Sequence, residues 1–271
     1  MSSKDLEIAV AAAKDATKVI KSFNDQHRSL NVQYKGRHDL VTKADVASEE
    51  KIISVIKDAY PDDLILAEET ASDNTLSEDR VWIIDPIDGT TNFTHGFPAY
   101  CVSIALYEYR EAKIGLVYEV THGEMFTAEK GKGAFLNGEK ISVSNYSKAD
   151  ESLLGTGFPY RDLELVDEYL DLFKVFMYET QGVRRPGSAA YDLCSVAAGR
   201  FEGFYEYGLS PWDVAAGALI IREAGGIVTD WNGGDDWLFG KRIVTGNPDI
   251  HSYVLKRLKE NISEKHRSGK K

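Results

Sequence analysis

The chain has 271 residues, of which 43% are hydrophobic, and it carries a formal net charge of −11. This acidic balance argues against a nucleic acid as the main partner, because phosphate backbones select clustered Lys and Arg. Two distant, unpatterned cysteines, Cys101 and Cys194, indicate core thiols in a reducing compartment rather than a disulfide framework. No apolar run reaches the length of a membrane span, so we expect a soluble, cytoplasmic protein without a membrane partner.

The first half of the chain predicts two helices and an antiparallel meander. Apolar residues recur at helical spacing over 6–23 and 45–60, and a short strand is expected near Tyr34. Asn137 and Gly138, between two short apolar segments, are a strong hairpin signal. The expected strands are 64–67, 81–84, 100–106, 112–120, 124–129 and the two arms of the hairpin at 134–144.

The second half alternates strands with helices, which indicates a mixed α/β subdomain. The expected strands are 152–158, 201–207 and 227–230, and the expected helices are 163–178, 189–199, 211–224 and 249–261. The polar stretch 145–151 marks a boundary, so we expect an N-terminal α+β subdomain at 1–148 and a C-terminal subdomain at 149–263. The charged tail, 264–271, is expected to be disordered.

The segment 81–93, VWIIDPIDGTTNF, is the most informative stretch. An apolar run of strand length ends in two carboxylates, Asp85 and Asp88. Gly89 and Thr90 follow in a pattern typical of a helix start, where free backbone N–H groups accept a phosphate. Carboxylates beside such a start suit a phosphate ester with Mg²⁺. Alone, however, D-x-x-D-G after a strand is equally compatible with a turn and an Asx cap.

Three further acids occupy positions that local structure alone would explain. Asp45 opens a predicted helix and would be an ordinary cap. Glu68 follows the strand 64–67, and carboxylates at strand ends are usually solvated. However, this strand and the strand 81–84 both end in acidic residues within a short stretch of the chain. Asp213 opens a helix of small residues, so it is either a cap or an acid that faces a cleft between the subdomains.

Two strings together resemble the inositol monophosphatase family of Mg²⁺-dependent, lithium-sensitive phosphatases. DPIDGT at 85–90 is similar to its first motif, and GLSPWDVAAGALIIREAGG at 208–226 is similar to its W-D-x-A-A-G…E-A-G-G motif. KGRHDLVTKAD, ILAEET and RRPGSAAYDLCSVAAGRFEGFYE extend the resemblance over nearly the whole chain, the last toward the bacterial branch. The resemblance implies a layered αβαβα sandwich, in the α+β and α/β classes, and a homodimer.

The resemblance also implies a role for each matching position. The implied metal ligands are the side chains of Glu68, Asp85, Asp88 and Asp213 and the carbonyl of Ile87. The implied catalytic residues are Glu68, Asp88 and the pair Asp45 and Thr90, which orients the attacking water. Backbone N–H groups of Gly89 and Thr90 would hold the phosphate, with Lys35 nearby. Asp88 and Asp213 would also contact the substrate, whose alcohol part would meet Gly187, Ser188, Ala189 and Glu206.

Four acids in one cleft cannot all stay ionised without cations, and oxygen ligands suit Mg²⁺. The resemblance implies two or three Mg²⁺ ions, with Li⁺ or Ca²⁺ inhibitory. Some members carry Thr where this chain has Ser188, and Ala67, Pro186 and Pro211 are further local departures that leave every charged ligand in place. They put substrate preference in more doubt than metal chemistry. His95, close to the first motif, is expected to be a structural or rim residue.

The predicted activity is hydrolysis of inositol monophosphate, with inositol 1-phosphate as the substrate, by a metal-activated water. Related substrates stay open: histidinol phosphate, fructose 1,6-bisphosphate, NADP and 3′-phosphoadenosine 5′-phosphate. Arg184 and Arg185 either hold a second phosphate or are surface or subunit-interface arginines. From other classes, the chain could be a regulatory binding protein that retains the fold, since some bacterial relatives bind transcription factors, or a non-catalytic acidic Ca²⁺-binding protein.

Overall fold

The structure is a computed structural model that describes residues 2–23, 33–36, 39–70, 76–160 and 162–268, with the backbone alone at 33–36 and 39–41. Within these ranges the helices are α1 (Lys4–Ser22), α2 (Lys43–Ala59), α3 (Thr90–Thr94), α4 (Val166–Glu179), α5 (Ala189–Ala197), α6 (Pro211–Glu223), α7 (Pro248–Asn261) and α8 (Glu264–Ser268), with a 3-10 turn η2 (Ala149–Glu151). The helices expected in the sequence are all present, with shifted ends.

The larger sheet has seven strands in chain order. They are β3 (Leu64–Ala67), β4 (Val81–Asp88), β5 (Cys101–Glu108), β6 (Glu111–Glu119), β7 (Glu124–Glu129), β8 (Gly133–Leu136) and β9 (Glu139–Ile141). Only β3 and β4 run parallel, and β4 to β9 form the predicted antiparallel meander. The β8–β9 turn places Asn137 and Gly138 at positive φ, 50° and 86°, as a tight hairpin requires.

The smaller sheet is mixed and has the order β11-β10-β12-β14-β13. Its strands are β10 (Leu153–Thr156), β11 (Gly182–Arg184), β12 (Gly203–Tyr207), β13 (Ile227–Thr229) and β14 (Arg242–Gly246), and a separate pair joins β1 (Gln33–Gly36) to β2 (Asp39–Val41). The sequence prediction missed β2, β11 and β14. Each is short, and β11 is an edge strand with no buried residue, so it lacks the apolar alternation that reveals a strand.

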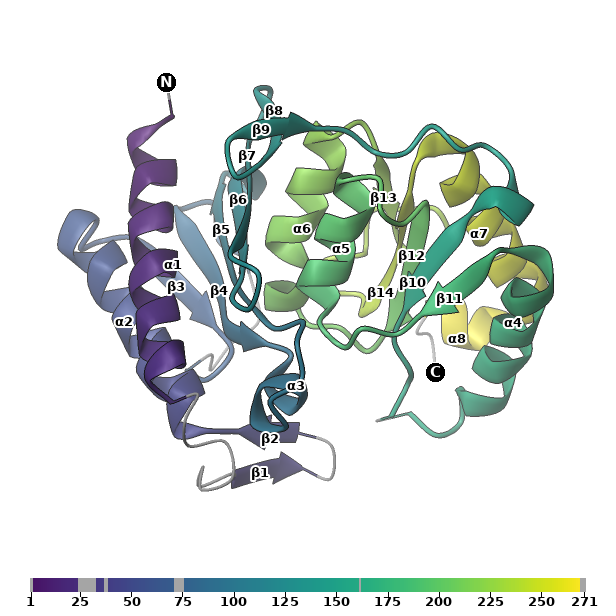
Figure 1. The fold of residues 1–271 in the computed structure, drawn as a ribbon, viewed down its shortest axis with the longest axis horizontal. Coiled ribbons are helices and arrows are strands. Elements are labelled where there is room, and N and C mark those ends of the chain that lie inside the picture. Colours follow the sequence, from purple (N-terminus) through teal and green to yellow (C-terminus); the bar gives the residue numbers. More distant parts are fainter. Residues whose placement is uncertain (1, 24–32, 37–38, 71–75, 161, 269–271) are drawn as a thin grey trace.

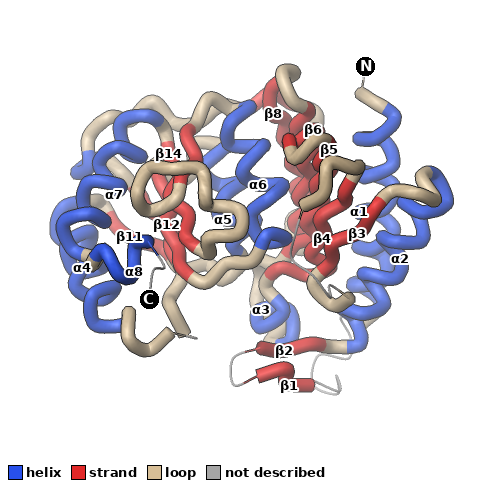
Figure 2. Tube along the Cα trace, turned by 180° about the vertical axis from the view of Figure 1, so that it is seen from behind, coloured by secondary structure: helices blue, strands red, loops and turns tan. Residues whose placement is uncertain are grey.

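These elements stack in five layers. Helices α1 and α2 cover the outer face of the seven-stranded sheet, α5 and α6 lie between the two sheets, and α4 and α7 cover the far face of the smaller sheet (Figure 1). The reverse view shows the same order (Figure 2). Alternate residues of β4 serve different layers, because Trp82 and Ile84 pack toward α1 and α2 whereas Val81 and Ile83 pack toward α5 and α6. The layered αβαβα sandwich is confirmed.

Helix α6 of the central layer packs very closely against β6 and α5. A Cβ at Gly115 of β6 would lie 2.6 Å from the Ala216 carbonyl oxygen of α6, and a Cβ at Gly217 would lie 2.6 Å from the Leu193 side chain of α5. The small residues of α6 therefore let this helix press against both a strand and a neighbouring helix. As a result, the first turn of α6 is held in a fixed position relative to the seven-stranded sheet.

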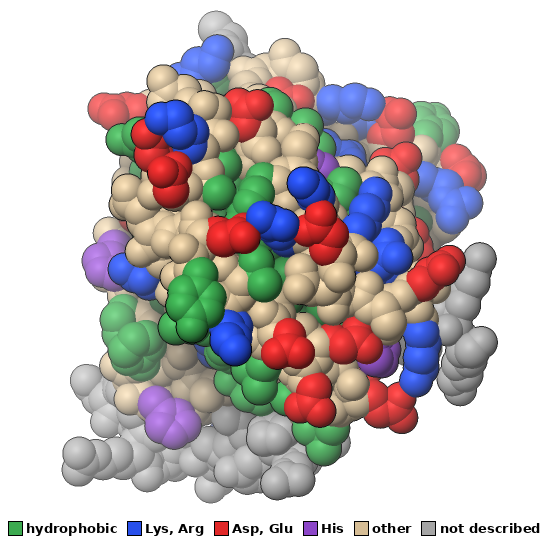
Figure 3. Space-filling view, turned by 90° about the vertical axis from the view of Figure 1, so that its right-hand side faces the viewer, with side chains coloured by type: hydrophobic (Ala, Val, Ile, Leu, Met, Phe, Trp, Pro, Cys, Tyr) green, Lys and Arg blue, Asp and Glu red, His purple; other side chains and the backbone are tan. Residues whose placement is uncertain are grey.

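The expectation that the charged tail is disordered was wrong for its first part, which forms α8. Its charges find partners on the C-terminal half: Lys265 Nζ lies 2.6 Å from Glu164, and Arg267 donates to Asn232 Oδ1 at 2.9 Å. Acidic and basic side chains are interspersed over this face of the molecule (Figure 3). Residues 269–271 lie outside the described part of the chain.

Two smaller expectations concern membranes and thiols. Among the helices that the structure describes, none has the length and apolar character needed to cross a bilayer. Both cysteines are free and buried, as the sequence predicted. The subdomain boundary at 145–151 stays a prediction; in the structure, η2 begins within it, between the last strand of the larger sheet and the first strand of the smaller one.

Candidate metal centre and active site

A β-bulge brings the two carboxylates of the DPID segment to the same place. Asp85 pairs with Ser103 and Asp88 with Cys101, so two residues of β4 oppose the single residue Val102 of β5. In a regular strand, residues three positions apart face opposite sides of the sheet. The extra residue cancels that alternation, and Asp85 and Asp88 point into one cluster.

This cluster is completed from the other half of the chain. Asp85, Asp88 and Asp213 each offer a carboxylate oxygen, and these oxygens lie within 4.8 Å of one another. Burial raises the pKa of Asp85 well above its usual range, and the charges of Glu68, Asp88 and Asp213 raise it further. Clustered oxygen donors that repel one another when ionised form a set suited to Mg²⁺.

Asp213 combines the two roles that the sequence left open. It is the third residue of α6, and its Oδ2 accepts a hydrogen bond from the Ser210 backbone N–H at 2.7 Å, which completes a capping box. The Ser103 hydroxyl on β5 donates to the Trp212 carbonyl at 3.0 Å, which fastens this turn to the larger sheet. Asp213 is therefore a helix cap and a member of the acidic cluster.

Glu68 lies beside the cluster at the end of β3. Its backbone N–H donates to the Ile84 carbonyl at 3.2 Å, which continues the parallel ladder, and its charge acts on Asp85. It is outside the group of three oxygens within 4.8 Å. Glu49, which the sequence analysis did not single out, supports this strand end by accepting from the Glu69 backbone N–H at 2.8 Å. Its position on the buried face of α2 with Ile52 was the available signal.

Thr90 and Asp45 form a hydroxyl–carboxylate pair next to the cluster. The Thr90 hydroxyl lies 3.1 Å from Asp45 Oδ1 and 3.0 Å from the Ile87 carbonyl, and its single proton can serve one acceptor at a time. Asp45 Oδ2 accepts from the Thr42 N–H at 2.7 Å and from the Thr42 hydroxyl at 2.6 Å. Burial raises the pKa of Asp45 to about 6, against the opposing effect of the Thr42 bonds.

The other half of the chain also holds Asp88. Asp88 Oδ2 accepts from the Ser188 hydroxyl at 2.7 Å and from the Ala190 backbone N–H at 2.6 Å, so it caps the start of α5. Burial raises the pKa of Asp88, while these bonds and one from the Ala189 N–H act in the opposite direction. The Ser188 side chain thus contacts Asp88, and its predicted contact with the substrate alcohol stays a prediction.

Gly89 and Gly187, two of the predicted substrate-binding residues, lie close to each other. Gly89 has φ +95°, and a Cβ there would lie 2.9 Å from the Ala99 carbonyl, so no other residue fits without strain. Asn92 Nδ2 donates to the Ala99 carbonyl at 2.7 Å and to the Pro186 carbonyl at 2.9 Å, which holds the segment containing Gly187 against α3. Sequence analysis did not assign Asn92 a role, although its place in TTNF was a signal.

Glu206, predicted to lie on the alcohol side, and Asp213 both line a cavity of about 180 Å³. Burial raises the pKa of Glu206 to about 8, which the charge of Arg185 opposes. A Cβ at Gly157 would lie 1.8 Å from Glu206 Oε1, so only glycine leaves room for this carboxyl. Lys35 lies in β1, where the structure describes the backbone alone, so its predicted role stays a prediction.

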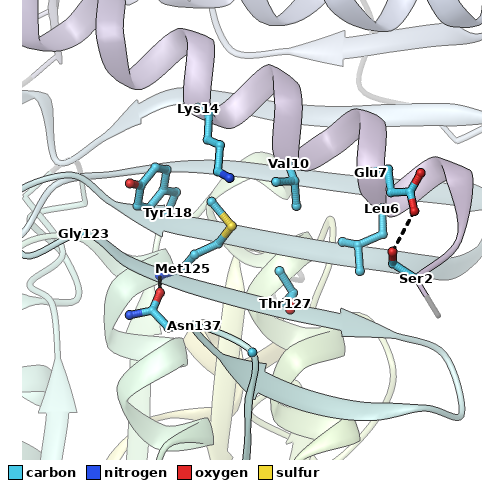
Figure 4. A pocket seen from close by; sticks show the side chains of 11 residues that line it. Ser2, Leu6, Glu7, Val10, Lys14, Tyr118, Gly123, Met125, Thr127 and Asn137 are labelled. Carbon is cyan, nitrogen blue, oxygen red and sulfur yellow. Dashed lines mark hydrogen bonds between the residues drawn. The ribbon is translucent and has the colours of Figure 1, made fainter.

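Two other features are separate from this site. His95 is exposed, and its Nδ1 lies 2.9 Å from the Thr91 carbonyl. A second pocket of about 500 Å³ lies between α1, the strands β6 and β7, and the β8–β9 turn (Figure 4). Its charged lining residues are Glu7 and Lys14, and Glu7 already accepts a hydrogen bond from Ser2 at 2.9 Å. No cluster of carboxylates lines it among the described residues, so it does not share the chemistry of the acidic cluster.

Comparisons with known proteins agree with this geometry. A putative Nus factor SuhB of Neisseria meningitidis serogroup B is 42% identical over 257 residues, covering 95% of this chain and 98% of that protein. The crystal structure of the extragenic suppressor protein SuhB from Bartonella henselae has a TM-score of 0.91 and 39% identity, covering 96% of this chain and all of that one. An inositol monophosphatase from Anabaena has a TM-score of 0.81 and 37% identity, with 94% and 95% covered. The model of the inositol monophosphatase family matches residues 1–266, and the chain belongs to that family.

Proposed function

We propose that this chain is a Mg²⁺-dependent phosphomonoesterase that hydrolyses inositol monophosphate, with inositol 1-phosphate as the test substrate. The observation that carries the proposal is the group of Asp85, Asp88 and Asp213 oxygens beside the Thr90–Asp45 pair. Two or three bound Mg²⁺ ions would supply charge neutralisation and lower the pKa of a water molecule. Glu68 and the Ile87 carbonyl would complete the ligand set.

Side chains and backbone groups of the protein would carry out proton transfer and bind the phosphate. The Thr90 hydroxyl takes a proton from the attacking water and relays its own to Asp45, whose pKa of about 6 suits a proton acceptor near neutral pH. Backbone N–H groups of Gly89 and Thr90 hold the phosphate oxygens, with Lys35 as a nearby cation. These groups act on the phosphate, which every phosphomonoester shares.

Glu206 acts instead on the alcohol. Its carboxyl lies in the cavity that Asp213 also lines, where it hydrogen-bonds to a hydroxyl of the polyol. Gly187, Ser188 and Ala189 form the wall beside it. The substrate alternatives, histidinol phosphate, NADP, fructose 1,6-bisphosphate and the adenosine bisphosphate, differ in what they place in this cavity.

The test is a panel of phosphate monoesters assayed with Mg²⁺, in which kcat/KM is compared for inositol 1-phosphate and the four alternatives. The proposal expects the highest value for inositol 1-phosphate. Release of phosphate at the background rate from every ester would contradict it and favour the reading as an acidic Ca²⁺-binding protein. Li⁺ is expected to inhibit without relief by excess substrate, and Ca²⁺ to inhibit in competition with Mg²⁺.

The name of the Neisseria relative, putative Nus factor, favours a second candidate function. In that case the chain is a regulatory protein that binds a protein partner through the same fold, with or without catalysis. A variant without turnover, Asp213→Asn, separates the two, because a purely regulatory role survives it in a cell-based complementation assay. A cytoplasmic location and a homodimer also stay predictions, the latter for light scattering after gel filtration.

A further inference from the structure

The cavity at the alcohol side is the space into which a leaving group must extend. It shares Asp213 with the acidic cluster, and Glu206 lies in it. Its remaining walls include the rings of Tyr160 and Tyr207 and the side chain of Arg185. An alcohol that departs from a phosphate at the cluster therefore meets aromatic faces, a carboxyl and a guanidinium.

The Arg185 side chain is folded back toward this cavity. Its guanidinium lies over the Tyr160 ring, 5.4 Å from the ring centroid, a distance at which cation–π attraction operates. Its Nη1 lies 2.6 Å from the place that a Cβ on Gly187 would occupy, so the group rests against the Gly187 backbone. No ion pair with a carboxylate of the described residues accompanies these contacts, which leaves the donors of Arg185 available.

The acidic groups around Arg185 are already engaged or buried. Asp162 accepts a hydrogen bond from the Tyr207 hydroxyl at 2.9 Å. Asp192 is 1% exposed on α5, and burial raises its pKa well above the usual range. Burial likewise raises the pKa of Glu206 to about 8, which favours its neutral form at neutral pH. Asp192 and Glu206 therefore repel a bound anion less than two ionised carboxylates would.

Its neighbour Arg184 has a different environment. It ends the edge strand β11, and its Nη1 donates to the Val183 carbonyl at 3.2 Å. Among the described residues that line the cavity, Arg185 is present and Arg184 is not. The two arginines that the sequence treated as a pair thus occupy different environments.

We propose that Arg185 is a specificity-determining residue that binds an anionic substituent, a second phosphate or a carboxylate, on the leaving alcohol. A guanidinium offers two parallel N–H donors to such a group, and charge-assisted pairs of this kind are the stronger hydrogen bonds. The inference rests on the proposed phosphomonoesterase function and extends its substrates beyond neutral polyols.

The test compares substrates across three variants with Mg²⁺ present. Arg185→Gln removes the charge, Arg185→Lys keeps the charge without the planar fork, and Arg184→Gln is the matched control. Arg185→Gln is expected to lower kcat/KM for fructose 1,6-bisphosphate by roughly tenfold or more, and for inositol 1-phosphate and p-nitrophenyl phosphate by less than about threefold. Arg185→Lys should fall between, and Arg184→Gln should match the unsubstituted protein. Equal losses on all three substrates, or the same pattern in Arg184→Gln, would overturn the inference.

A binding measurement separates this inference from the proposed function. Turnover of p-nitrophenyl phosphate reports on the phosphomonoesterase activity alone. Calorimetric titration with fructose 1,6-bisphosphate, with the inhibitory ion Ca²⁺ in place of Mg²⁺, measures binding without turnover, and Arg185→Gln should weaken this binding by roughly tenfold or more. If no ester is hydrolysed, the proposed function fails while the titration still decides the role of Arg185. Equal affinity in the unsubstituted protein and Arg185→Gln means that Arg185 does not bind the second anion.

Discussion

The two ends of the candidate site are built by different means. At the metal end, secondary structure fixes the side chains: a bulge aims Asp85 and Asp88, and the first turn of α6 holds Asp213. At the alcohol end, Glu206 depends on the space left by Gly157, and Arg185 rests on a tyrosine ring. The metal end is thus held by backbone hydrogen bonds, and the alcohol end by side-chain packing.

This difference assigns different consequences to substitutions. A change at the metal end would remove groups that we propose to act on the phosphate or the metals, so all substrates should lose activity together. A change at the alcohol end should alter one substrate relative to another.

The largest effect is expected from Asp213→Asn. It removes one of three clustered carboxylates and should nearly abolish turnover of every ester. Because it relieves repulsion, the Tm without metal should be equal or higher, while the rise on adding Mg²⁺ should shrink. A ligand at a hundred times its Kd stabilises a fold by about 2.7 kcal/mol, so the loss is measurable by thermal unfolding.

Asp192→Asn is the matched control, since Asp192 is also a buried acid but lies on α5 outside the cluster. It should raise the metal-free Tm as well and keep the full shift with Mg²⁺, which EDTA should reverse. A full shift and full activity in Asp213→Asn would mean that Asp213 is only a helix cap.

Thr90→Ala should lower kcat by about 10²–10⁴-fold, the usual result of removing general-base catalysis. The loss should be the same for inositol 1-phosphate and p-nitrophenyl phosphate, and the Mg²⁺-dependent rise in Tm should stay nearly unchanged. Thr91→Ala, an exposed threonine on the same helix, is the control. A kcat near that of the unsubstituted protein would remove Thr90 from the proton path.

Ser188→Ala should weaken Mg²⁺ binding by about 10–100-fold, because groups that orient metal ligands contribute that much. Its hydroxyl is one of the donors to Asp88 Oδ2. Ser188→Thr keeps a hydroxyl and should restore affinity, whereas Ser195→Ala, a buried serine on the same helix, should have no effect. If Ser188→Ala raises KM for the alcohol and leaves Mg²⁺ affinity intact, Ser188 contacts substrate instead.

The contact of Ser188 with Asp88 could not be predicted from the sequence. Asp85, Asp88 and Thr90 could be singled out because they follow a strand end and open a helix, which are local features. Asp45, Glu68 and Asp213 were assigned to the site through the family resemblance. The bond from Ser188 to Asp88 joins residues one hundred positions apart, and no local pattern reveals such a contact. The sequence resemblance alone placed Ser188 on the substrate side.

The fold divides in the same way. The meander and the longer helices follow from periodicity and turn residues within single segments. Strands β11 and β14 depend on pairing with β10 and β12, which are distant in the chain. Likewise, Lys265 and Arg267 of α8 contact Glu164 and Asn232, partners that composition alone does not place nearby.

Protonation of Asp45 should determine how kcat falls at acid pH. Its pKa of about 6 means that acid protonates it and blocks proton acceptance, so kcat should fall about tenfold at one pH unit below that value. Asp45→Asn should have low activity and no acid limb. The raised pKa of Asp45 also links its protonation to folding stability. The contribution of Asp45 to the free energy of unfolding is fully present at a pH below its ordinary pKa, and it is lost as the pH rises through about 6. The metal-free Asn variant should therefore be at least as stable at neutral pH. An acid limb that persists in Asp45→Asn belongs to another group.

The smallest effect, and the sharpest test of the contrast, is expected from Gly157→Ala. A Cβ at this position would lie 1.8 Å from Glu206 Oε1, and the backbone there is outside the left-handed region, so the fold accepts alanine while the Glu206 carboxyl must turn away. Loss of one hydrogen bond to the polyol should raise KM for inositol 1-phosphate by roughly 3–10-fold. p-Nitrophenyl phosphate, which has no hydroxyl for Glu206, should be hydrolysed as before, and Glu206→Gln should show the same selectivity. A displaced Glu206 can affect the two esters differently only if its carboxyl contacts the alcohol. Equal losses of activity on both esters would therefore mean that Glu206 supports metal binding or the fold.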